Sequence, residues 1–282
     1  KILASRGFVP TITPNGIAIT PVDSQIFEIP EYESALNAYP RGIRHKKFSL
    51  SVFQLSRSDG PIVKTDIDVG TLDDLWVLLD CGEPVSRSFK ASGLSYDTID
   101  RIFLSHTHSD HVGGFFMLLQ GFWLEKRRKP LTVHLPGDAI PPLQQMLTTA
   151  YLFKEMLTFE LTFEPLQARQ PLACGAWTIT PYRTTHLDGF RKNFQGKYPG
   201  NYDAFCFALE RDGCRIGHSA DLGGVEDLTP LLAHPLDLLV CELAHFRAEA
   251  LFEFLQGRAI RHLVFTHLDR RYWENFEQTR QL

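Results

Sequence analysis

Three imidazoles and a carboxylate occur within six consecutive positions of this chain. The run 105–114 reads Ser-His-Thr-His-Ser-Asp-His-Val-Gly-Gly. In an extended segment side chains alternate in direction, so His106, His108 and Asp110 can point one way, while His111 reaches inward where the chain turns. Imidazole nitrogen and carboxylate oxygen are ligands that zinc takes. The run predicts a metal site that suits two cations better than one; the alternative is a polar loop in which each buried imidazole needs its own hydrogen-bond partner.

The segments on either side of this run predict the elements that position it. The apolar stretch 99–104 predicts a buried strand and the run 115–124 a helix. Gly113 and Gly114 let the backbone pack closely between the metal ligands and that helix. Further apolar runs predict strands at 131–136, 159–163, 204–209 and 236–240 and a helix at 142–157.

The pattern His106-x-His108-x-Asp110-His111, followed by two glycines, resembles the signature of the metallo-β-lactamase superfamily. The resemblance implies an α/β fold, the four-layer αβ/βα metallo-β-lactamase sandwich, with the metal site at one edge. It also implies hydrolysis of an ester, amide or phosphodiester bond.

Three later segments resemble those that supply the superfamily's remaining ligands. A β-rich segment ends at His186, and another strand ends at His267. Asp221 lies in a sequence similar to the superfamily's Ser-Gly-Asp turn, with Ala220 in place of glycine. The implied ligands of one ion are His106, His108 and His186, those of the other are Asp110, His111 and His267, and Asp221 bridges the two. Zinc is the expected metal, with manganese and iron as alternatives.

The C-terminal third resembles the ribonuclease Z branch of the superfamily. The stretch 266–272 is similar to its Thr-His-x-Ser-x-Arg-Tyr motif, with Asp269 replacing serine. The resemblance implies that Glu242 and His245 form a general acid pair that protonates the leaving oxygen, while Asp110 helps to orient the attacking hydroxide. The alternative for Glu242 is a position near the start of a helix at about 246–255, which the helix dipole would favour.

Two departures from that branch bear on the substrate. Only two residues separate Glu242 from His245, where ribonuclease Z enzymes have an extra segment, and Phe246-Arg247 replaces the usual Ser-Thr. The sequence also lacks the long Gly/Pro-rich arm that those enzymes use to grip transfer RNA. A small or locally bound phosphodiester is therefore expected, as for the smaller phosphodiesterases of the superfamily.

The loop after His186 mixes cations with aromatic residues, a combination that suits a phosphate and a base. Arg191 and Lys192 are the predicted phosphate contacts, and the alternative is a solvated hairpin with its aromatic rings packed down. The basic run 126–129 is expected to be structural, because it ends the helix predicted at 115–124.

Composition is consistent with these expectations. The chain has 282 residues, 44% of them hydrophobic, which is consistent with one domain. The resemblance implies that this domain, at 47–282, is the hydrolase, and it is preceded by an N-terminal extension, 1–46, of unknown role. That extension could wrap the domain, line the site or mediate a homodimer. The net charge of −4 argues against a protein that grips long nucleic acid. Five scattered cysteines without a Cys-x-x-Cys motif favour reduced thiols in the cytoplasm, and no apolar run is long enough to span a membrane.

The leading hypothesis is a dinuclear metal-dependent hydrolase, a phosphodiesterase that uses metal-activated hydroxide on a small or nucleotide-type phosphodiester. The alternatives are an ester, lactone or thioester hydrolase on the same metals, and a true tRNA 3′-processing endonuclease. A non-catalytic metal-binding or redox-sensing module is the third class.

Overall fold

The computed structural model describes residues 7–13, 16–22, 49–52, 65–68, 77–83, 85–91 and 94–274, and side chains within 77–83, 85–90 and 94–272. The chain divides into two compact units. The first unit comprises Lys1–Leu135 and Ala139–Glu164, and the second comprises Pro136–Asp138 and Pro165–Leu282. Most of the extension 1–46 lies outside the described residues, so its expected roles stay predictions. The part that is described is an antiparallel hairpin of β1 (Gly7–Thr13) and β2 (Gly16–Val22).

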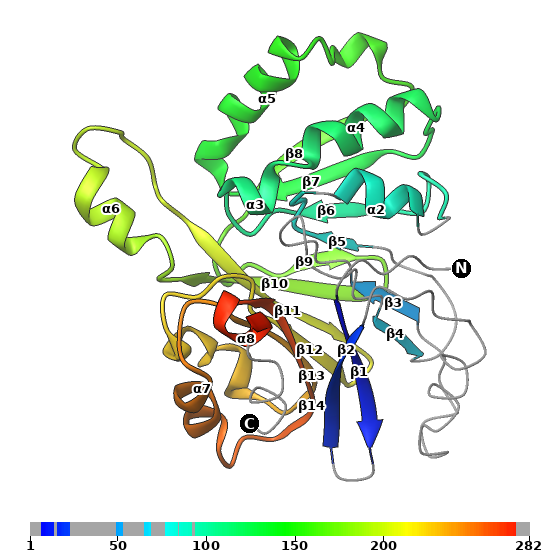
Figure 1. The fold of residues 1–282 in the computed structure, drawn as a ribbon. Helices are drawn as coiled ribbons and strands as arrows, with labels where there is room; N and C mark the ends of the chain where they lie inside the picture. The colour runs from blue at the N-terminus through cyan, green and yellow to red at the C-terminus, as the bar shows by residue number, and fades with distance from the viewer. Residues whose placement is uncertain are drawn as a thin grey trace. The chain divides into compact units, whose positions relative to one another are not determined.

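The first unit is built on a four-stranded sheet (Figure 1). Its strands, in spatial order, are β5 (Val77–Leu79), β6 (Arg101–Phe103), β7 (Leu131–Leu135) and β8 (Leu161–Pro165). The first three are parallel, and almost all of their apolar residues are buried, as expected for strands covered on both faces. A separate antiparallel pair is formed by β3 (Ser49–Val52) and β4 (Thr65–Asp68).

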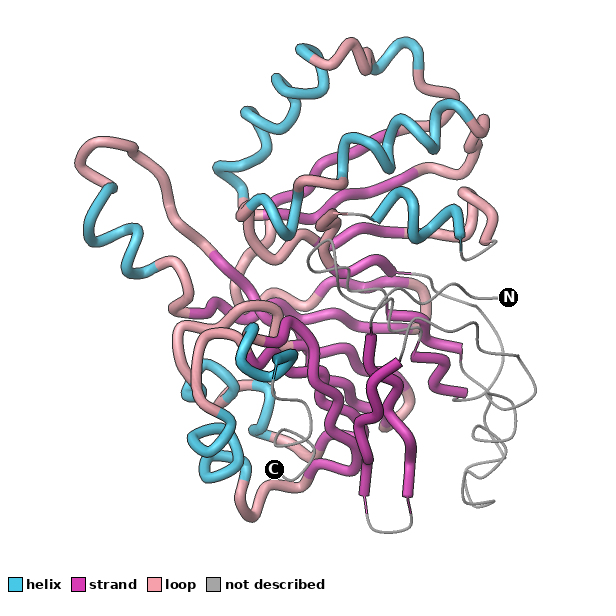
Figure 2. The backbone as a smooth tube through the Cα atoms, in the orientation of Figure 1, coloured by secondary structure: helices cyan, strands magenta, loops and turns pink. Residues whose placement is uncertain are grey.

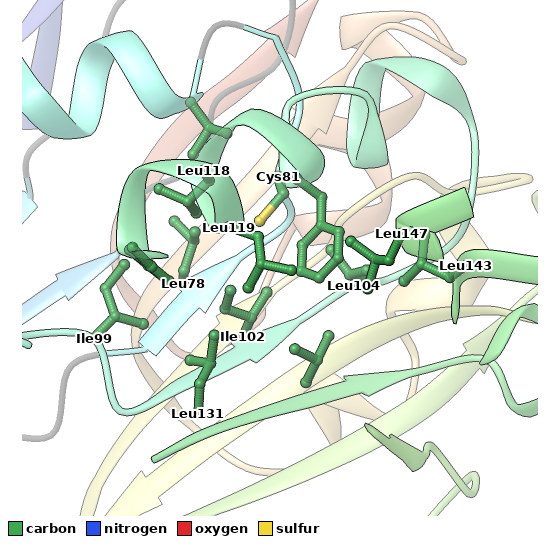
Figure 3. Packing of buried hydrophobic residues seen from close by; sticks show 14 of the residues in the cluster. Leu78, Cys81, Ile99, Ile102, Leu104, Leu118, Leu119, Leu131, Leu143 and Leu147 are labelled. Carbon is green, nitrogen blue, oxygen red and sulfur yellow. The ribbon is translucent and has the colours of Figure 1, made fainter. Parts of the chain in front are cut away.

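The helix predicted at 115–124 is confirmed. It is α4 (Phe115–Leu124), and its residues Leu118 and Leu119 pack into the core beside Leu78 and Ile102 of the sheet (Figure 3). The first unit also contains α2 (Val85–Ala91), α3 (Ser109–Val112), α5 (Ile140–Thr149) and the 3-10 turns η2 (Gly137–Ala139) and η3 (Lys154–Met156).

The single helix predicted at 142–157 is wrong in its second half. The helix α5 ends at Thr149, and the chain then turns through Tyr151, whose φ of 59° lies in the left-handed region. A residue with this backbone conformation interrupts a right-handed helix. The separate turn η3 follows.

Arg127 explains why the basic run after α4 is structural. Its side chain is buried, and its guanidinium donates hydrogen bonds to the carbonyl oxygens of Tyr96, Ile99 and Pro130. It also lies over the ring of Phe122, 5.1 Å from the ring centre. The helix dipole therefore explains only part of the role of this cation. Arg127 also satisfies backbone carbonyl oxygens of the segments that lie next to it.

The second unit is built on a six-stranded sheet (Figure 2). The spatial order is β14 (Ile260–Leu268), β13 (Leu236–Leu243), β12 (Cys214–His218), β11 (Ala204–Arg211), β10 (Trp177–Thr184) and β9 (Leu172–Cys174). The strands β12, β13 and β14 are parallel to one another. In the other half of the sheet, β9 pairs antiparallel with β10, β10 with β11, and β11 with β12. It follows that β10, β12, β13 and β14 all run in the same direction.

Short helices connect these strands or, in one case, follow the last of them. They are α6 (Asp188–Phe194), η4 (Val225–Leu228), η5 (Leu231–Ala233), α7 (Ala248–Leu255) and α8 (Arg270–Glu274). Ala248 and Leu251 of α7 pack in one buried cluster with Leu239 and Cys241 of β13 and with Leu228 of η4. The apolar face of the amphipathic helix α7 thus covers the parallel half of the sheet.

Two expectations from composition can be compared with the structure. All five cysteines are free thiols, in agreement with the absence of a disulfide framework. Among the helices that the structure describes, none has the length and apolar character needed to cross a bilayer.

Candidate metal centre

In the first unit, two neighbouring parallel strands deliver the polar residues. Asp80 directly follows β5, and Ser105 and His106 come two and three residues after the end of β6. Because carboxyl ends of parallel strands meet at one edge of a sheet, these side chains lie together, as ligand-binding residues do in other α/β sheets.

Asp80 is the centre of a buried hydrogen-bond network. It is 2% exposed, and its carboxylate accepts bonds from the Ser105 backbone N–H (2.7 Å), the Ser105 hydroxyl (2.8 Å) and Nδ1 of His111 (2.7 Å). The Ser105 hydroxyl also lies 3.0 Å from Nδ1 of His106. With each Nδ1 bound in this way, the Nε2 atoms of both histidines are the ones directed to a ligand, which is how metal-binding histidines are oriented in proteins.

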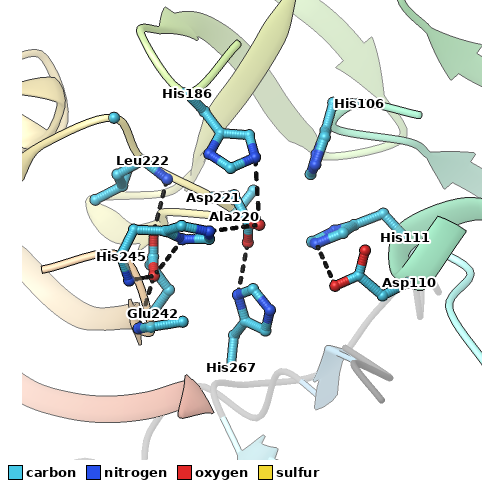
Figure 4. Close-up of polar contacts among 12 residues, drawn as sticks. His106, Asp110, His111, His186, Ala220, Asp221, Leu222, Glu242, His245 and His267 are labelled. Carbon is cyan, nitrogen blue, oxygen red and sulfur yellow. Dashed lines mark hydrogen bonds and ion pairs between the residues drawn. The ribbon is translucent and has the colours of Figure 1, made fainter. Parts of the chain in front are cut away.

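The histidines of the sequence motif form one cluster within the first unit. The ring of His106 lies 4.7 Å from that of His108 and 4.1 Å from that of His111, measured between ring centres. The short helix α3 gives the turn expected after His108, and within it His111 Nε2 lies 3.9 Å from an oxygen of Asp110 (Figure 4). The four predicted ligands of this unit are therefore brought together.

The two glycines after the motif are required by close packing. A Cβ atom on Gly113 would lie 2.5 Å from the Ser109 carbonyl oxygen, and one on Gly114 would lie 2.4 Å from that of Gly82. The predicted close approach of the backbone at this point is confirmed.

In the second unit, the shared direction of β10, β12, β13 and β14 explains how distant residues meet. His186 comes two residues after β10, Asp221 three residues after β12, and Glu242 lies at the end of β13. His267 lies at the end of β14. All four residues are therefore at the same edge of the sheet.

Asp221 lies at the centre of this group. Its side chain is 2% exposed, with Oδ1 2.9 Å from Nδ1 of His267 and Oδ2 3.6 Å from Nε2 of His186 and 3.9 Å from Nε2 of His245 (Figure 4). The candidate ligand atoms of Asp221, His245 and His267 all lie within 4.8 Å of one another. Ala220, which stands where the superfamily has glycine, has a φ of 47°, the left-handed conformation that glycine adopts most readily.

His267 is directed toward Asp221 by a local irregularity of the sheet. Glu242 pairs with Thr266 and Leu243 pairs with Leu268, so that His267 is an extra residue in β14. Its φ is 48°. A β-bulge of this kind changes the direction of a side chain at a strand end, and this explains how a strand residue becomes a ligand candidate.

Glu242 and His245 form the pair that the sequence predicts. Glu242 is fully buried, and both of its oxygens lie 2.9 Å from Nδ1 of His245. The hydrogen bond with Glu242 raises the pKa of His245, against the lowering effect of burial. The alternative role for Glu242, near the start of a helix, is wrong because α7 begins only at Ala248.

Glu242 also holds the turn that carries Asp221. It accepts hydrogen bonds from the backbone N–H groups of Leu222 (2.7 Å), Ala244 (2.8 Å) and His245 (3.0 Å). One buried carboxylate therefore connects Asp221 and His245, and this connection was not predicted from the sequence.

The predicted phosphate contacts lie on α6. Arg191 donates to the carbonyl oxygen of Asn201 and lies 3.7 Å from Asp203, so its guanidinium helps to hold the loop that follows the helix. Lys192 lies next to it on α6. The alternative of a hairpin is wrong, because the segment forms a helix. Phosphate contact by these two residues stays a prediction.

Other histidines have different roles. His218 is buried, and its Nδ1 accepts a hydrogen bond from the backbone N–H of Ala220, the residue before Asp221, at 3.1 Å. His134 is fully buried and stacked on Phe103 at 4.5 Å between ring centres. It packs in the core of the first unit.

The donors of the two units suit divalent metal. Each unit presents imidazole nitrogens together with a carboxylate, and the imidazoles of His106 and His111 have their second nitrogen bonded to Ser105 or Asp80. Such a donor set fits zinc, and its carboxylates also admit manganese or iron.

Comparison with known proteins agrees with this chemistry. Residues 69–225, more than half of the chain, match the family described as anti-Pycsar protein Apyc1. The chain belongs to this family. A ribonuclease Z from Pyrococcus abyssi is 30% identical over 110 residues, which are 39% of this chain and 35% of that protein. The chain thus spans about a third of the length of the curated relatives that it matches.

Solved structures with the same fold include proteins that are enzymes by name. The short form of human tRNase Z superposes with a TM-score of 0.55 at 19% identity, covering 69% of this chain and 82% of that one. A diphosphatase of the PhnP family gives a TM-score of 0.55 at 16% identity, covering 75% and 76%. The α/β metallo-β-lactamase fold predicted from the signature is confirmed, as is the resemblance to the ribonuclease Z branch, and the homologues of this chain are hydrolases.

Proposed function

We propose that this chain is a metal-dependent phosphodiesterase that acts on a small or locally bound phosphodiester. The observation that carries the proposal is the contact of His245 with buried Glu242 on one side and its approach to Asp221 on the other. A proton donor beside candidate metal ligands is what cleavage of a phosphodiester with a poor leaving group requires.

The proposed ligands are those implied by the sequence. One divalent ion would be held by His106, His108 and His186, a second would be held by Asp110, His111 and His267, and Asp221 would be a ligand shared by both. When bound, two such ions lower the pKa of a water molecule and neutralise charge on the phosphoryl oxygens. The Asp80 network supports this assignment, because its hydrogen bond to Nδ1 fixes the orientation of the His111 ring.

The residues of the chain supply orientation and the proton. Asp110 and Asp221 accept hydrogen bonds from the attacking water and orient it toward phosphorus. Glu242 binds Nδ1 of His245, which orients the ring and raises its pKa, so that the charged form of the ring is favoured. The proton on Nε2 then passes to the leaving alkoxide. The side chain of His245 is 35% exposed, so a substrate oxygen can reach it.

Two other activities would use the same residues. A carboxylic ester, lactone or thioester hydrolase needs the metals but depends less on His245, since many of its leaving groups depart without a strong acid. The similarity to ribonuclease Z favours RNA as a second phosphodiester substrate. The family to which the chain belongs is described as an anti-Pycsar protein. If this chain has that role, the proposed hydrolytic site is the part of the protein that would carry it out.

A comparison of substrates tests the proposal. Protein stripped with a chelator and reloaded with zinc, manganese or iron would be assayed with bis-p-nitrophenyl phosphate, p-nitrophenyl acetate, a lactone and a single-stranded RNA. We expect the phosphodiester to be preferred over the ester and the lactone. Preference for the ester or lactone would contradict the proposal, and absence of turnover with all three metals would favour a non-catalytic metal-binding module.

A further inference from the structure

One carboxylate of the second unit binds two loops at once. Asp227, in η4, accepts hydrogen bonds from the Thr185 backbone N–H (2.9 Å), the Thr185 hydroxyl (3.0 Å) and the Gly223 backbone N–H (2.8 Å). All three bonds end on the same oxygen, Oδ2.

The two loops carry proposed metal ligands. Thr185 directly precedes His186, and Gly223 comes two residues after Asp221. A second contact ties the same loops together in the buried interior, where the Thr184 hydroxyl donates to the Asp221 carbonyl oxygen at 3.0 Å. Displacing one loop relative to the other would therefore change the spacing of the two ligands.

The loops touch so closely that only glycine fits between them. A Cβ atom on Gly223 would lie 2.2 Å from the Thr185 hydroxyl oxygen and 2.8 Å from the Thr185 carbonyl oxygen. The second of these atoms belongs to the backbone and cannot rotate away. The separation of Nε2 of His186 from Oδ2 of Asp221, 3.6 Å, is thus set by a tight contact and three hydrogen bonds.

We propose that Asp227 is a positioning residue for the metal site: it holds His186 against Asp221 and so determines the affinity for the ion that these two ligands share. The inference rests on the proposed function, because it presupposes that His186 and Asp221 are ligands. Groups that orient ligands in this way typically change metal affinity by about 10- to 100-fold.

The test is a zinc titration of chelator-stripped protein in competition with a chromophoric chelator. For Asp227→Ala we expect the affinity for one of two ions to fall by about 10- to 100-fold and the other to change little. Asp227→Asn keeps an amide oxygen at the position of Oδ2 and should recover most of the loss. Glu226→Ala removes the neighbouring carboxylate of η4 and, as the matched charge control, should bind zinc like the parent.

A second pair of variants keeps the inference testable if Asp227→Ala folds poorly. Gly223→Ala places a methyl group against Thr185 and should weaken the same ion without any change of charge. Gly189→Ala is its control, because a Cβ atom on Gly189 meets no other atom within 4 Å. Thermal unfolding of the metal-free proteins reports separately on the fold.

The outcomes separate the inference from the proposed function. Unchanged zinc affinity in both Asp227→Ala and Gly223→Ala, with a parent that binds two ions, would overturn the inference alone. A parent that binds fewer than two ions would overturn the proposed function and the inference together. Equal weakening in Glu226→Ala would also overturn the inference, since the effect would then be one of charge rather than position.

Discussion

The Nδ1 atom of His245 lies 2.9 Å from each carboxylate oxygen of Glu242, three residues earlier in the chain. Glu242 is fully buried and also binds the backbone of Leu222, next to Asp221. A carboxylate in this position both orients the imidazole and stabilises its charged form. The proton donor and the proposed bridging ligand are thus held by one group, so that changes at Glu242 should affect both.

Replacing His245 with alanine should reduce turnover according to the leaving group. For a phosphodiester with an alkoxide leaving group we expect a loss of about 100- to 10,000-fold, because a positioned general acid is worth that much. For bis-p-nitrophenyl phosphate, whose leaving group needs little protonation, the loss should be much smaller. Steady-state kcat on the two substrates, measured at full metal loading, checks the difference.

His234→Ala is the matched control for that variant, because this histidine is exposed and follows η5 rather than lying at the ligand edge. It should leave both rates unchanged. Equal losses on both substrates in His245→Ala would mean that His245 acts as a metal ligand or in substrate binding, and not as the acid.

Asp80→Asn should weaken metal binding without unfolding the protein. Asparagine tolerates the left-handed backbone of this position, where φ is 62°. It loses the charge that binds Nδ1 of His111, so affinity for the ion held by His111 should fall by about 10- to 100-fold. Zinc competition measures this loss. Asp100→Asn, which removes a carboxylate paired with Lys129 at the surface, should bind zinc like the parent.

His134 should make the protein less stable in acid. Burial, together with the smaller effect of the nearby positive charge of Arg101, lowers the pKa of His134 to about 4. The unfolded chain, with an ordinary pKa of 6.5, takes up the proton first, so this contribution is complete above pH 6.5 and is lost as the pH falls toward 4. At about 1.4 kcal/mol per pKa unit, the loss is roughly 3 kcal/mol.

Urea unfolding between pH 4 and pH 7 checks this dependence. His134→Gln keeps an acceptor for Arg101, which lies 3.0 Å from Nε2, but cannot take up a proton. The variant should therefore lose less stability than the parent over this range. Parallel pH profiles of the two proteins would show that other groups cause the acid sensitivity.

Arg127→Met should destabilise the first unit strongly. The substitution leaves the buried carbonyl oxygen of Ile99 and the partly buried carbonyl oxygen of Pro130 without their guanidinium donor, which lies 2.7 and 2.8 Å from them. Unsatisfied buried groups cost about 1 to 3 kcal/mol each, so we expect a loss of about 3 kcal/mol in the free energy of unfolding. Arg128→Met, at an exposed position, should change it by less than about 0.5 kcal/mol. A loss of similar size in both variants would argue against the special role of Arg127.

Those parts of the structure that depend on local pattern could be predicted from the sequence. The helix α4 and the strands β7 and β11 begin where the apolar runs begin, because one continuous hydrophobic segment fills each of them. The end of α5 could not be predicted, since it depends on the left-handed turn at Tyr151, and nothing in the residue type signals that conformation.

In the candidate site, too, some features could be predicted from the sequence and others could not. The residues that could bind metal were predicted from their spacing and from the resemblance, and the structure brings together those within each unit. Asp227, which holds the loops of His186 and Asp221, was not predicted, because it binds backbone N–H groups, which leave no pattern in the sequence. The bulge that directs His267 toward Asp221 depends on the pairing of β13 with β14. It could therefore not be predicted from the sequence of β14 alone.

The most direct test of the central claim is a metal titration followed by activity. Chelator-stripped protein would receive zinc in steps while hydrolysis of bis-p-nitrophenyl phosphate is recorded against bound metal. We predict that activity rises until about two ions are bound per chain and then stays constant, as expected for a two-metal site. Full activity with one ion per chain, or activity that does not depend on metal, would contradict the account.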